Sequence, residues 1–161
     1  MADILIRQAT ASDQAAIAEL IGGVYAEYGD ELCLDDAEKD LTEIPEYYHD
    51  RDGDFVVMCD RDEIIGCHAV LPISGKSGTC TFRRLYLTHS RRGGGCGKLL
   101  MQWAVDWARD QGFKRIEFWS DTRFTHAHGF FKSFGFNETG NIRHMEDSFE
   151  PYSEYFFFMN L

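Results

Sequence analysis

Residues 92–98 read Arg92-Gly93-Gly94-Gly95-Cys96-Gly97-Lys98 and lie between two regular patterns. An alternating apolar run, Leu85-Tyr86-Leu87, precedes them, and an amphipathic run begins at Leu99. This order predicts a strand, a tight glycine turn and a helix. The first turn of a helix leaves its N–H groups unpaired and carries positive potential, and glycines let a bulky anion approach the backbone closely. Because Arg91, Arg92 and Lys98 add charged donors, the stretch predicts a phosphate-binding site.

The spacing of the glycines excludes two common phosphate-binding motifs. A Walker loop needs Gly-x4-Gly-Lys-Ser/Thr, but Arg92 stands where its first glycine belongs and Leu99 where its hydroxyl belongs. A dinucleotide-binding Gly-x-Gly-x-x-Gly also fails, because its last glycine falls on Lys98 or on Leu100, according to the starting glycine. The phosphate is therefore expected to belong to another class of ligand.

The pattern that does fit is Arg-x-x-Gly-x-Gly over residues 92–97, after a strand and before a helix. It resembles the acyl-CoA signature of the GNAT family of N-acetyltransferases, with His89 in place of the proline usual in that loop. Residues 127–136 resemble the family's later helix ending in Gly-Phe, and residues 119–124 resemble the end of its fifth strand. The two motifs stand in the family's order, so the resemblance covers essentially the whole chain.

The resemblance implies one GNAT-like domain over residues 1–161 with an α/β (mixed α+β) fold. A central mixed, mostly antiparallel twisted sheet of six to seven strands is expected, flanked by about four helices. The sequence pattern predicts strands at residues 4–7, 55–58, 64–71, 79–87, 114–119, 138–145 and 154–161. It predicts helices at residues 10–28, 34–48, 98–111 and 125–134. The third of these helices is expected to bury Leu99, Leu100, Trp103, Ala104, Trp107 and Ala108.

The resemblance also implies how acetyl-CoA would be held as a co-substrate. The pyrophosphate would take its donors from the glycine turn, and the pantetheine arm would lie like an added strand along residues 85–87. A backbone N–H there would polarise the thioester carbonyl. The expected cofactor-binding residues are Leu85, Tyr86, Leu87, Arg92, Gly93, Gly94, Gly95, Cys96, Gly97 and Lys98.

Catalysis by such an enzyme needs a neutral amine, a base that removes its proton and an acid for the departing thiolate. Phe131 stands where many family members carry a tyrosine that protonates the thiol, and a phenyl ring cannot donate a proton. Phe124 stands where an asparagine is often found. The catalytic residues therefore stay unassigned, with Tyr86 a candidate for the acid and Asp121 and His126 candidates for the base. No metal site is expected.

By the resemblance, an acidic segment borders the acceptor side of the site. Its acidic residues are Glu27, Asp30, Glu31, Asp35, Asp36, Glu38, Asp40, Glu43 and Glu46. An anionic rim would concentrate a cationic primary amine of a small molecule or peptide, such as a polyamine, amino acid, aminoglycoside or peptide N-terminus. The alternative is a solvated acidic face with no acceptor role, since charge runs usually face water.

The composition limits the remaining partners and the location. A net charge of −11 argues against binding nucleic acid, although local donors dominate at contact range because salt damps the global field beyond about 8 Å. No apolar run approaches the roughly 20 residues that cross a bilayer, and the N-terminus lacks a signal-peptide pattern. Scattered cysteines without a C-x-x-C pair suit a reducing cytoplasm. Phe157 and its neighbours in the last strand could pair across a homodimer.

Three functions stay open on these grounds. The first is acetyl transfer to a primary amine by direct attack in a ternary complex, the reaction implied by the resemblance. The second is a non-catalytic acyl-CoA-binding or sensor module, because Phe131 replaces the usual tyrosine. The third is a phosphate-sugar or nucleotide binder that uses the same turn.

Overall fold

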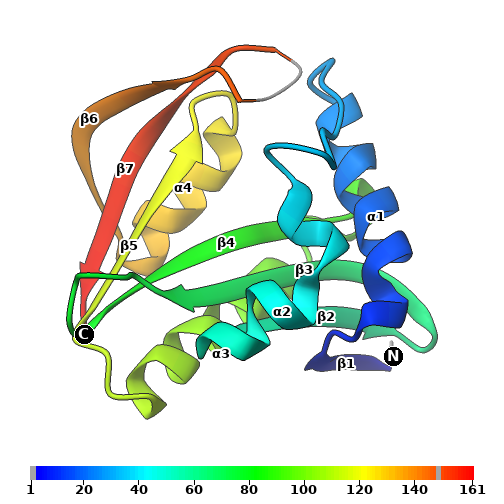
Figure 1. The fold of residues 1–161 in the computed structure, drawn as a ribbon, viewed down its shortest axis with the longest axis horizontal. Helices are drawn as coiled ribbons and strands as arrows, with labels where there is room; N and C mark the ends of the chain where they lie inside the picture. The colour runs from blue at the N-terminus through cyan, green and yellow to red at the C-terminus, as the bar shows by residue number, and fades with distance from the viewer. Residues whose placement is uncertain (1–2, 148–149) are drawn as a thin grey trace.

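The computed structural model describes residues 3–147 and 150–161 (Figure 1). The strands are β1 Ile4–Gln8, β2 Asp54–Asp60, β3 Glu63–Pro72, β4 Thr79–Leu87, β5 Arg115–Asp121, β6 Asn137–Met145 and β7 Tyr152–Asn160. The helices are α1 Gln14–Ala26, α2 Ile44–Tyr47, α3 Cys96–Asp110 and α4 Thr125–Phe134. The strands form one sheet in the order β1-β2-β3-β4-β5-β7-β6, antiparallel except where β4 meets β5. The predicted mixed, mostly antiparallel architecture is confirmed.

Helices cover both faces of the sheet, and the strand sequences show why. Along β2, Phe55, Val57 and Cys59 join one core cluster with α1 and α2 residues. The alternate residues Val56 and Met58 pack on the opposite face with Leu100 of α3. A strand buried on both faces reads as a continuous apolar run, as Phe55-Val56-Val57-Met58 does.

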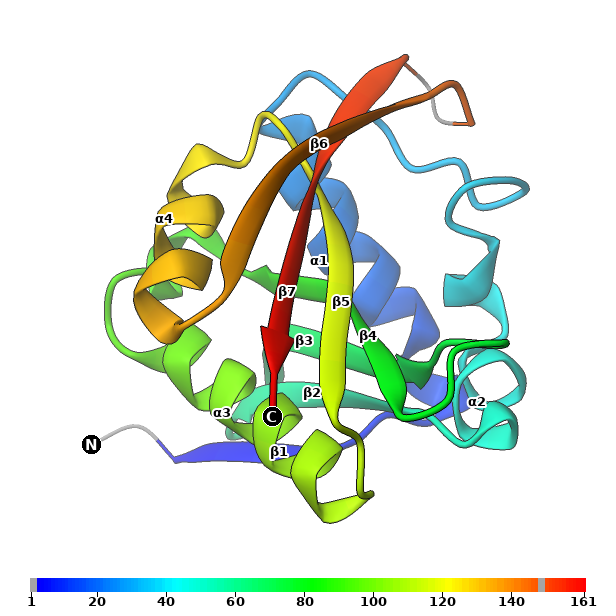
Figure 2. The same cartoon turned by 90° about the vertical axis from the view of Figure 1, so that its left-hand side faces the viewer.

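The sheet divides between β4 and β5. These two strands pair only at Thr79–Arg115 and Cys80–Ile116. Beyond those pairs they diverge, and β5, β7 and β6 run steeply across the direction of β1–β3 (Figure 2). Among the described residues, one edge of β4 is therefore left without a neighbouring strand from residue 81 onward.

A β-bulge interrupts β4 where it borders this opening. The register with β3 shifts between Cys67 and Ala69, opposite Arg84, whose φ of +59° is in the left-handed region. Such a conformation costs about 1–3 kcal/mol in a non-glycine residue and needs support from its surroundings. The Arg84 side chain supplies that support by donating to Asp40 Oδ1 at 2.7 Å and to Asp40 Oδ2 at 3.1 Å.

Two expectations about the helices are wrong. Residues 34–48 form no continuous helix; they contain turns, a short 3₁₀ helix at Lys39–Thr42 and the four-residue α2. Buried polar contacts of Glu38 and Asp40, rather than an amphipathic repeat, hold this segment. In α3 the buried face is rotated by about one residue from the expected one, so Leu99 is 53% exposed while Met101 and Val105 are buried.

The last strand, which could pair across a homodimer on the sequence alone, has neighbours on both sides in the described chain. β7 lies between β5 and β6, and Phe157 is fully buried against Phe118 and Phe131. Its edge is therefore already paired within the chain.

Among residues 3–147 and 150–161, no helix has the length and apolar character needed to span a bilayer.

Candidate functional site

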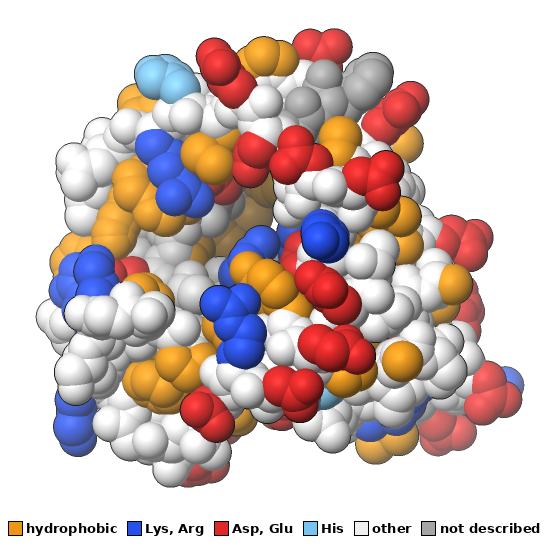
Figure 3. Space-filling model, viewed as in Figure 1, with side chains coloured by type: hydrophobic (Ala, Val, Ile, Leu, Met, Phe, Trp, Pro, Cys, Tyr) orange, Lys and Arg blue, Asp and Glu red, His pale blue; other side chains and the backbone are white. Residues whose placement is uncertain are grey.

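A cleft of about 1110 Å³ occupies the opening between β4 and β5. It is lined by the glycine turn and the start of α3, and also by α1, the loop after it and the start of β7. Figure 3 shows the molecule hollowed beside α1, with acidic side chains gathered on the α1 side. The cleft brings together residues that lie more than a hundred positions apart in the sequence.

The glycine turn presents free backbone donors to the cleft. Gly93 and Gly95 have φ values of +81° and +92°, and Gly95 is the N-cap of α3. In the described chain, no N–H of residues 93–98 donates a hydrogen bond to a protein acceptor. A Cβ placed on Gly93, Gly94 or Gly95 would meet no atom within 4 Å. The turn thus has the open, positive helix N-terminus that an anion requires.

The flanking side chains of this turn differ in their contacts. Lys98 is exposed beside the cleft, and Cys96 is partly buried in contact with the cluster that contains Leu100. The guanidinium of Arg92 is already bound: it donates to both carboxylate oxygens of Glu27 at 2.7 and 2.8 Å and to the Leu87 carbonyl oxygen at 3.0 and 3.2 Å. An anion at the turn would therefore compete with Glu27 for Arg92.

This competition leads to a prediction for Glu27→Gln. Removing the carboxylate frees Arg92 for a phosphate. We therefore expect coenzyme A to bind three- to tenfold tighter in calorimetry, a gain of about 1 kcal/mol in binding free energy. The gain should vanish when Arg92 is also changed to alanine. Glu19→Gln, an identical charge change on the exposed face of α1, serves as the control and should leave affinity unchanged. Equal gains in the presence and absence of Arg92 would show that Glu27 acts only through its charge.

The open edge of β4 supplies a second set of donors. Thr88 donates to the Ile65 carbonyl oxygen of β3, and alternate N–H groups of a strand point to opposite edges. The N–H groups of Leu87 and Leu85 therefore face the side where β4 has no partner. An extended ligand with amide groups could pair there as an added strand.

The predicted catalytic residues occupy very different surroundings. Tyr86 lines the cleft, with its ring 6.1 Å from that of Tyr25, and burial raises the pKa of its hydroxyl. Asp121 lines the cleft but is bound by Arg123 at 2.6 Å, which also binds Asp30 at 3.1 Å. His126 is exposed at the rim. The structure thus brings all three to one cleft but leaves Asp121 committed to an arginine.

The two phenylalanines that replace polar family residues serve as packing. Phe131 is buried against Phe118, with ring centroids 4.9 Å apart. Phe124 packs on Tyr28 at 4.8 Å and on Tyr86 at 6.4 Å. Neither side chain can donate or accept the protons of the expected reaction.

Only part of the acidic segment faces the cleft. Of its nine acidic side chains, Asp30 and Glu38 line the cleft. Glu27 and Asp40 do not line it, and they are bound by Arg92 and Arg84 respectively. The other five line no part of it: Glu31, Asp35, Asp36, Glu43 and Glu46. The anionic rim is thus narrower than the sequence predicted.

The cleft also contains two carboxylates that the sequence did not predict there. Asp147 and Glu154 line it, and Glu154 lies opposite Asp121 in the β5–β7 register. Burial raises the pKa of Glu154, which Arg143 binds at 2.6 Å. Strand pairing, rather than any local motif, places Glu154 here, so no pattern in the sequence marked it. No three His, Cys, Asp or Glu side chains among the described positions group so as to hold a metal ion.

His68 adds a buried polar atom under the cleft. Its Nδ1 lies 3.2 Å from the Leu100 carbonyl oxygen and therefore carries the proton, whereas its buried Nε2 has no partner within the described chain. Burial lowers the pKa of His68 to about 4 from the usual 6.5.

The buried histidine predicts loss of stability in acid. Between about pH 6.5 and pH 4 the unfolded chain binds a proton at His68 that the folded chain does not, so stability is full above this window and falls as pH falls through it. We expect a loss of about 3 kcal/mol by pH 4, measured by chemical denaturation. His68→Gln should flatten this slope, whereas His126→Gln, at an exposed position, should retain it. An unchanged slope in His68→Gln would contradict the assignment.

Comparison with known proteins places this chain in a family. The Acetyltransferase (GNAT) family model matches residues 21–136. The chain is 33% identical over 116 residues to the Escherichia coli (strain K12) protein named uncharacterized N-acetyltransferase YjgM, covering 69% of this chain and 68% of that protein. It is 27% identical over 153 residues to aminoglycoside N(6')-acetyltransferase type 1 of Stenotrophomonas maltophilia, covering 91% of this chain and 94% of the relative.

A solved structure shows the same fold. The structure of yncA from Salmonella typhimurium with its cofactor acetyl-CoA superimposes with a TM-score of 0.75 at 18% identity, covering 98% of this chain and 93% of the other. At this identity the likeness concerns the fold alone. Together with the family match over most of the chain, it means that the chain belongs to the GNAT family of acetyltransferases.

Proposed function

We propose that this protein transfers the acetyl group of acetyl-CoA to a cationic primary amine by direct attack of the amine in a ternary complex. The observation that carries the proposal is one cleft lined by two sets of groups of opposite character. Free N–H groups and Lys98 form one set, here called the cofactor end, and buried carboxylates form the other, here called the acceptor end. A polyanionic cofactor and a cationic acceptor could therefore share the same cleft.

The cofactor end would bind acetyl-CoA through three groups of contacts. The N–H groups of residues 93–98 and Lys98 would bind the pyrophosphate. Leu85 and Leu87 would offer their N–H groups to the pantetheine amides and the thioester oxygen. Tyr86, between them in the strand, would border the acyl group.

The acceptor end would select positive charge. In the part of the chain that the structure describes, five carboxylates line it, namely Asp30, Glu38, Asp121, Asp147 and Glu154, and so do four arginines, namely Arg83, Arg84, Arg123 and Arg143. The one negative charge that remains favours an amine that arrives as an ammonium. A relative of similar length is named for acetylating aminoglycosides, which are themselves polyamines. We propose that the acceptor is a small cationic amine of this kind or a peptide N-terminus, in the cytoplasm.

The second candidate function is a non-catalytic acyl-CoA-binding module. The observation in its favour is Phe131, which lies buried among aromatic rings where many relatives would offer a hydroxyl. Because a coenzyme A thiolate is a fair leaving group, loss of that acid slows turnover rather than preventing it. The two functions therefore differ in whether product forms at all.

Product analysis distinguishes these functions. The purified protein is incubated with acetyl-CoA and a panel of amines containing a polyamine, an aminoglycoside, amino acids and a peptide, and acetylated products are followed by mass spectrometry. Thiol dyes are avoided because the chain contains five cysteines. Acetylation of cationic members supports the enzyme, whereas tight cofactor binding without any product supports the module. Faster turnover of neutral acceptors would contradict charge selection.

A further inference from the structure

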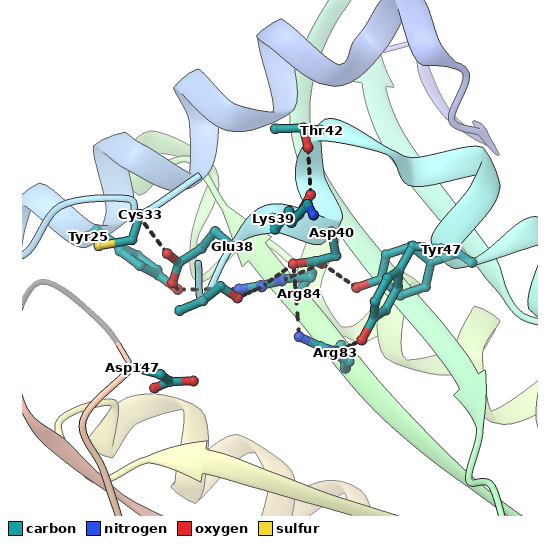
Figure 4. Close-up of polar contacts among 12 residues, drawn as sticks. Tyr25, Cys33, Glu38, Lys39, Asp40, Thr42, Tyr47, Arg83, Arg84 and Asp147 are labelled. Carbon is teal, nitrogen blue, oxygen red and sulfur yellow. Dashed lines mark hydrogen bonds and ion pairs between the residues drawn. The ribbon is translucent and has the colours of Figure 1, made fainter. Parts of the chain in front are cut away.

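Glu38 has the surroundings of a proton acceptor rather than of a structural ion pair. Its side chain lies in the cleft wall, and the residue is only 3% exposed. One carboxylate oxygen accepts from the Cys33 backbone N–H at 2.7 Å, and the other accepts from the Tyr25 hydroxyl at 3.1 Å. Both donors are neutral, so the negative charge of Glu38 is stabilised without being cancelled (Figure 4).

The other buried carboxylates of the cleft differ in this respect. Asp30 and Asp121 are both bound by Arg123. The partly exposed Glu154 is bound by Arg143. Within the described chain, Glu38 alone among the three buried carboxylates lining the cleft has no arginine or lysine within ion-pair distance. A carboxylate held by an arginine is a poor base, because losing its charge breaks the pair.

Tyr25 connects Glu38 to the open edge of β4. Arg84 Nη1 lies 3.3 Å from the Tyr25 hydroxyl oxygen, and a guanidinium can only donate. The Tyr25 O–H is therefore left to donate to Glu38. The Tyr25 ring packs edge-on against Tyr86, which lies between the two β4 residues whose N–H groups face the open edge.

We propose that Glu38 is the base of the acetyl transfer and takes the proton of the acceptor ammonium through the Tyr25 hydroxyl. The inference rests on the proposed function. Tyr25 accepts a proton from the ammonium as it passes its own proton to Glu38, which leaves a neutral amine. The amine nitrogen then forms a bond to the thioester carbonyl carbon, and the carbon–sulfur bond breaks. The second amine proton goes to the departing sulfur, and Glu38 returns the first to solvent.

The electrostatic surroundings agree with this role. Burial raises the pKa of the Glu38 carboxyl, and the charge of Asp40 raises it further. The charge of Arg84 and the hydrogen bonds that Glu38 accepts from Cys33 and Tyr25 oppose the rise. The charged or titratable side chains that face Glu38 from the neighbouring elements are Tyr25, Asp40, Arg84 and Tyr152. A carboxyl with a raised pKa accepts a proton more readily than an ordinary surface glutamate.

The test compares Glu38→Gln and Tyr25→Phe with the matched control Glu31→Gln. Glu31 lies on the same loop, is exposed, and loses the same charge on substitution. For a cationic amine at neutral pH, we expect kcat to fall about 100-fold in Glu38→Gln and about tenfold in Tyr25→Phe, with the KM for acetyl-CoA unchanged. The control should match the unaltered protein.

A pH series separates a base from a merely structural residue. As the pH approaches the pKa of the free amine, about 10, the acceptor loses its proton in solution, so the deficit of both variants should shrink. A constant deficit at all pH values, or a kcat for Glu38→Gln within threefold of the unaltered protein, would overturn the proposal. Should Glu38→Gln fail to fold, Tyr25→Phe decides, because it removes a single oxygen. If the unaltered protein forms no product, the proposed function falls and this inference falls with it.

Discussion

Gly95→Val is expected to weaken coenzyme A binding at least 100-fold. Gly95 ends the turn as the N-cap of α3, with a φ of +92°, and a Cβ there would extend into open space. That space is where a phosphate must approach the backbone donors. Charge-assisted hydrogen bonds contribute about 1.5–3 kcal/mol each, and loss of two of them exceeds the roughly 2.7 kcal/mol that corresponds to 100-fold. Isothermal titration calorimetry with coenzyme A measures the effect.

The control for this variant is Gly75→Val. Gly75 has a φ of +80°, no atom within 4 Å of a built Cβ, and a place in the turn between β3 and β4 rather than in the cleft lining. Both substitutions impose a strain of about 1–3 kcal/mol from a β-branched residue at positive φ, so both should lower the melting temperature similarly. Only Gly95→Val should lose affinity. Equal affinities for coenzyme A in the two variants would contradict the assignment of the glycine turn to the cofactor site.

Arg84→Met is expected to lower the free energy of unfolding by about 3–5 kcal/mol. The side chain of Arg84 is 8% exposed and that of Asp40 is 3% exposed, so removing the guanidinium leaves a buried carboxylate without its main partner. The guanidinium also donates to the Ala37 carbonyl oxygen at 3.2 Å. One side chain thus ties the β4 bulge to the loop that carries Glu38, and its loss should reduce catalysis as well as stability. Urea denaturation gives the stability and the amine assay gives the activity.

Arg7→Met supplies the comparison for a pair whose carboxylate, that of Asp13, is 11% exposed but whose arginine reaches the surface. Arg7 binds both oxygens of Asp13 at 2.8 and 2.9 Å, a geometry like that of Arg84 and Asp40, but its side chain is 41% exposed. Water screens such a pair, so we expect a loss below about 1 kcal/mol. Replacing both Arg84 and Asp40 by apolar residues should recover part of the stability that Arg84→Met loses. A loss under 1 kcal/mol in Arg84→Met would mean that the bulge does not depend on this pair.

The glycine turn and most elements of the fold could be predicted, because local patterns encode them. Helix α4 begins and ends at the predicted residues, and β2 and β3 contain the predicted strands at residues 55–58 and 64–71. The loop that carries Glu38 and Asp40 could not be predicted, because it is held by pairings with distant residues. Asp40 binds Arg84, 44 positions away, and Glu27 binds Arg92, 65 positions away. No periodicity along one sequence reports contacts of this kind.

The candidate site likewise has one part that could be predicted from the sequence and one part that could not. The glycine turn is a contiguous motif, so its residues could be named in advance as a candidate anion site. Tyr25 and Glu38 carry no motif, and only the folded chain shows that the hydroxyl and the carboxylate meet. The bulge at Arg84 is equally hidden, because arginine seldom adopts a positive φ and nothing in the sequence marks the exception.

The unpaired edge of β4 has a consequence for how the protein can be observed. Amide hydrogens that lack an acceptor exchange with deuterated solvent far faster than those inside a sheet ladder. Leu85, Leu87 and residues 93–98 should therefore label within the earliest time points in the absence of ligand. Slower labelling at these positions alone would map an arriving molecule along the strand and around the turn, even when no reaction takes place.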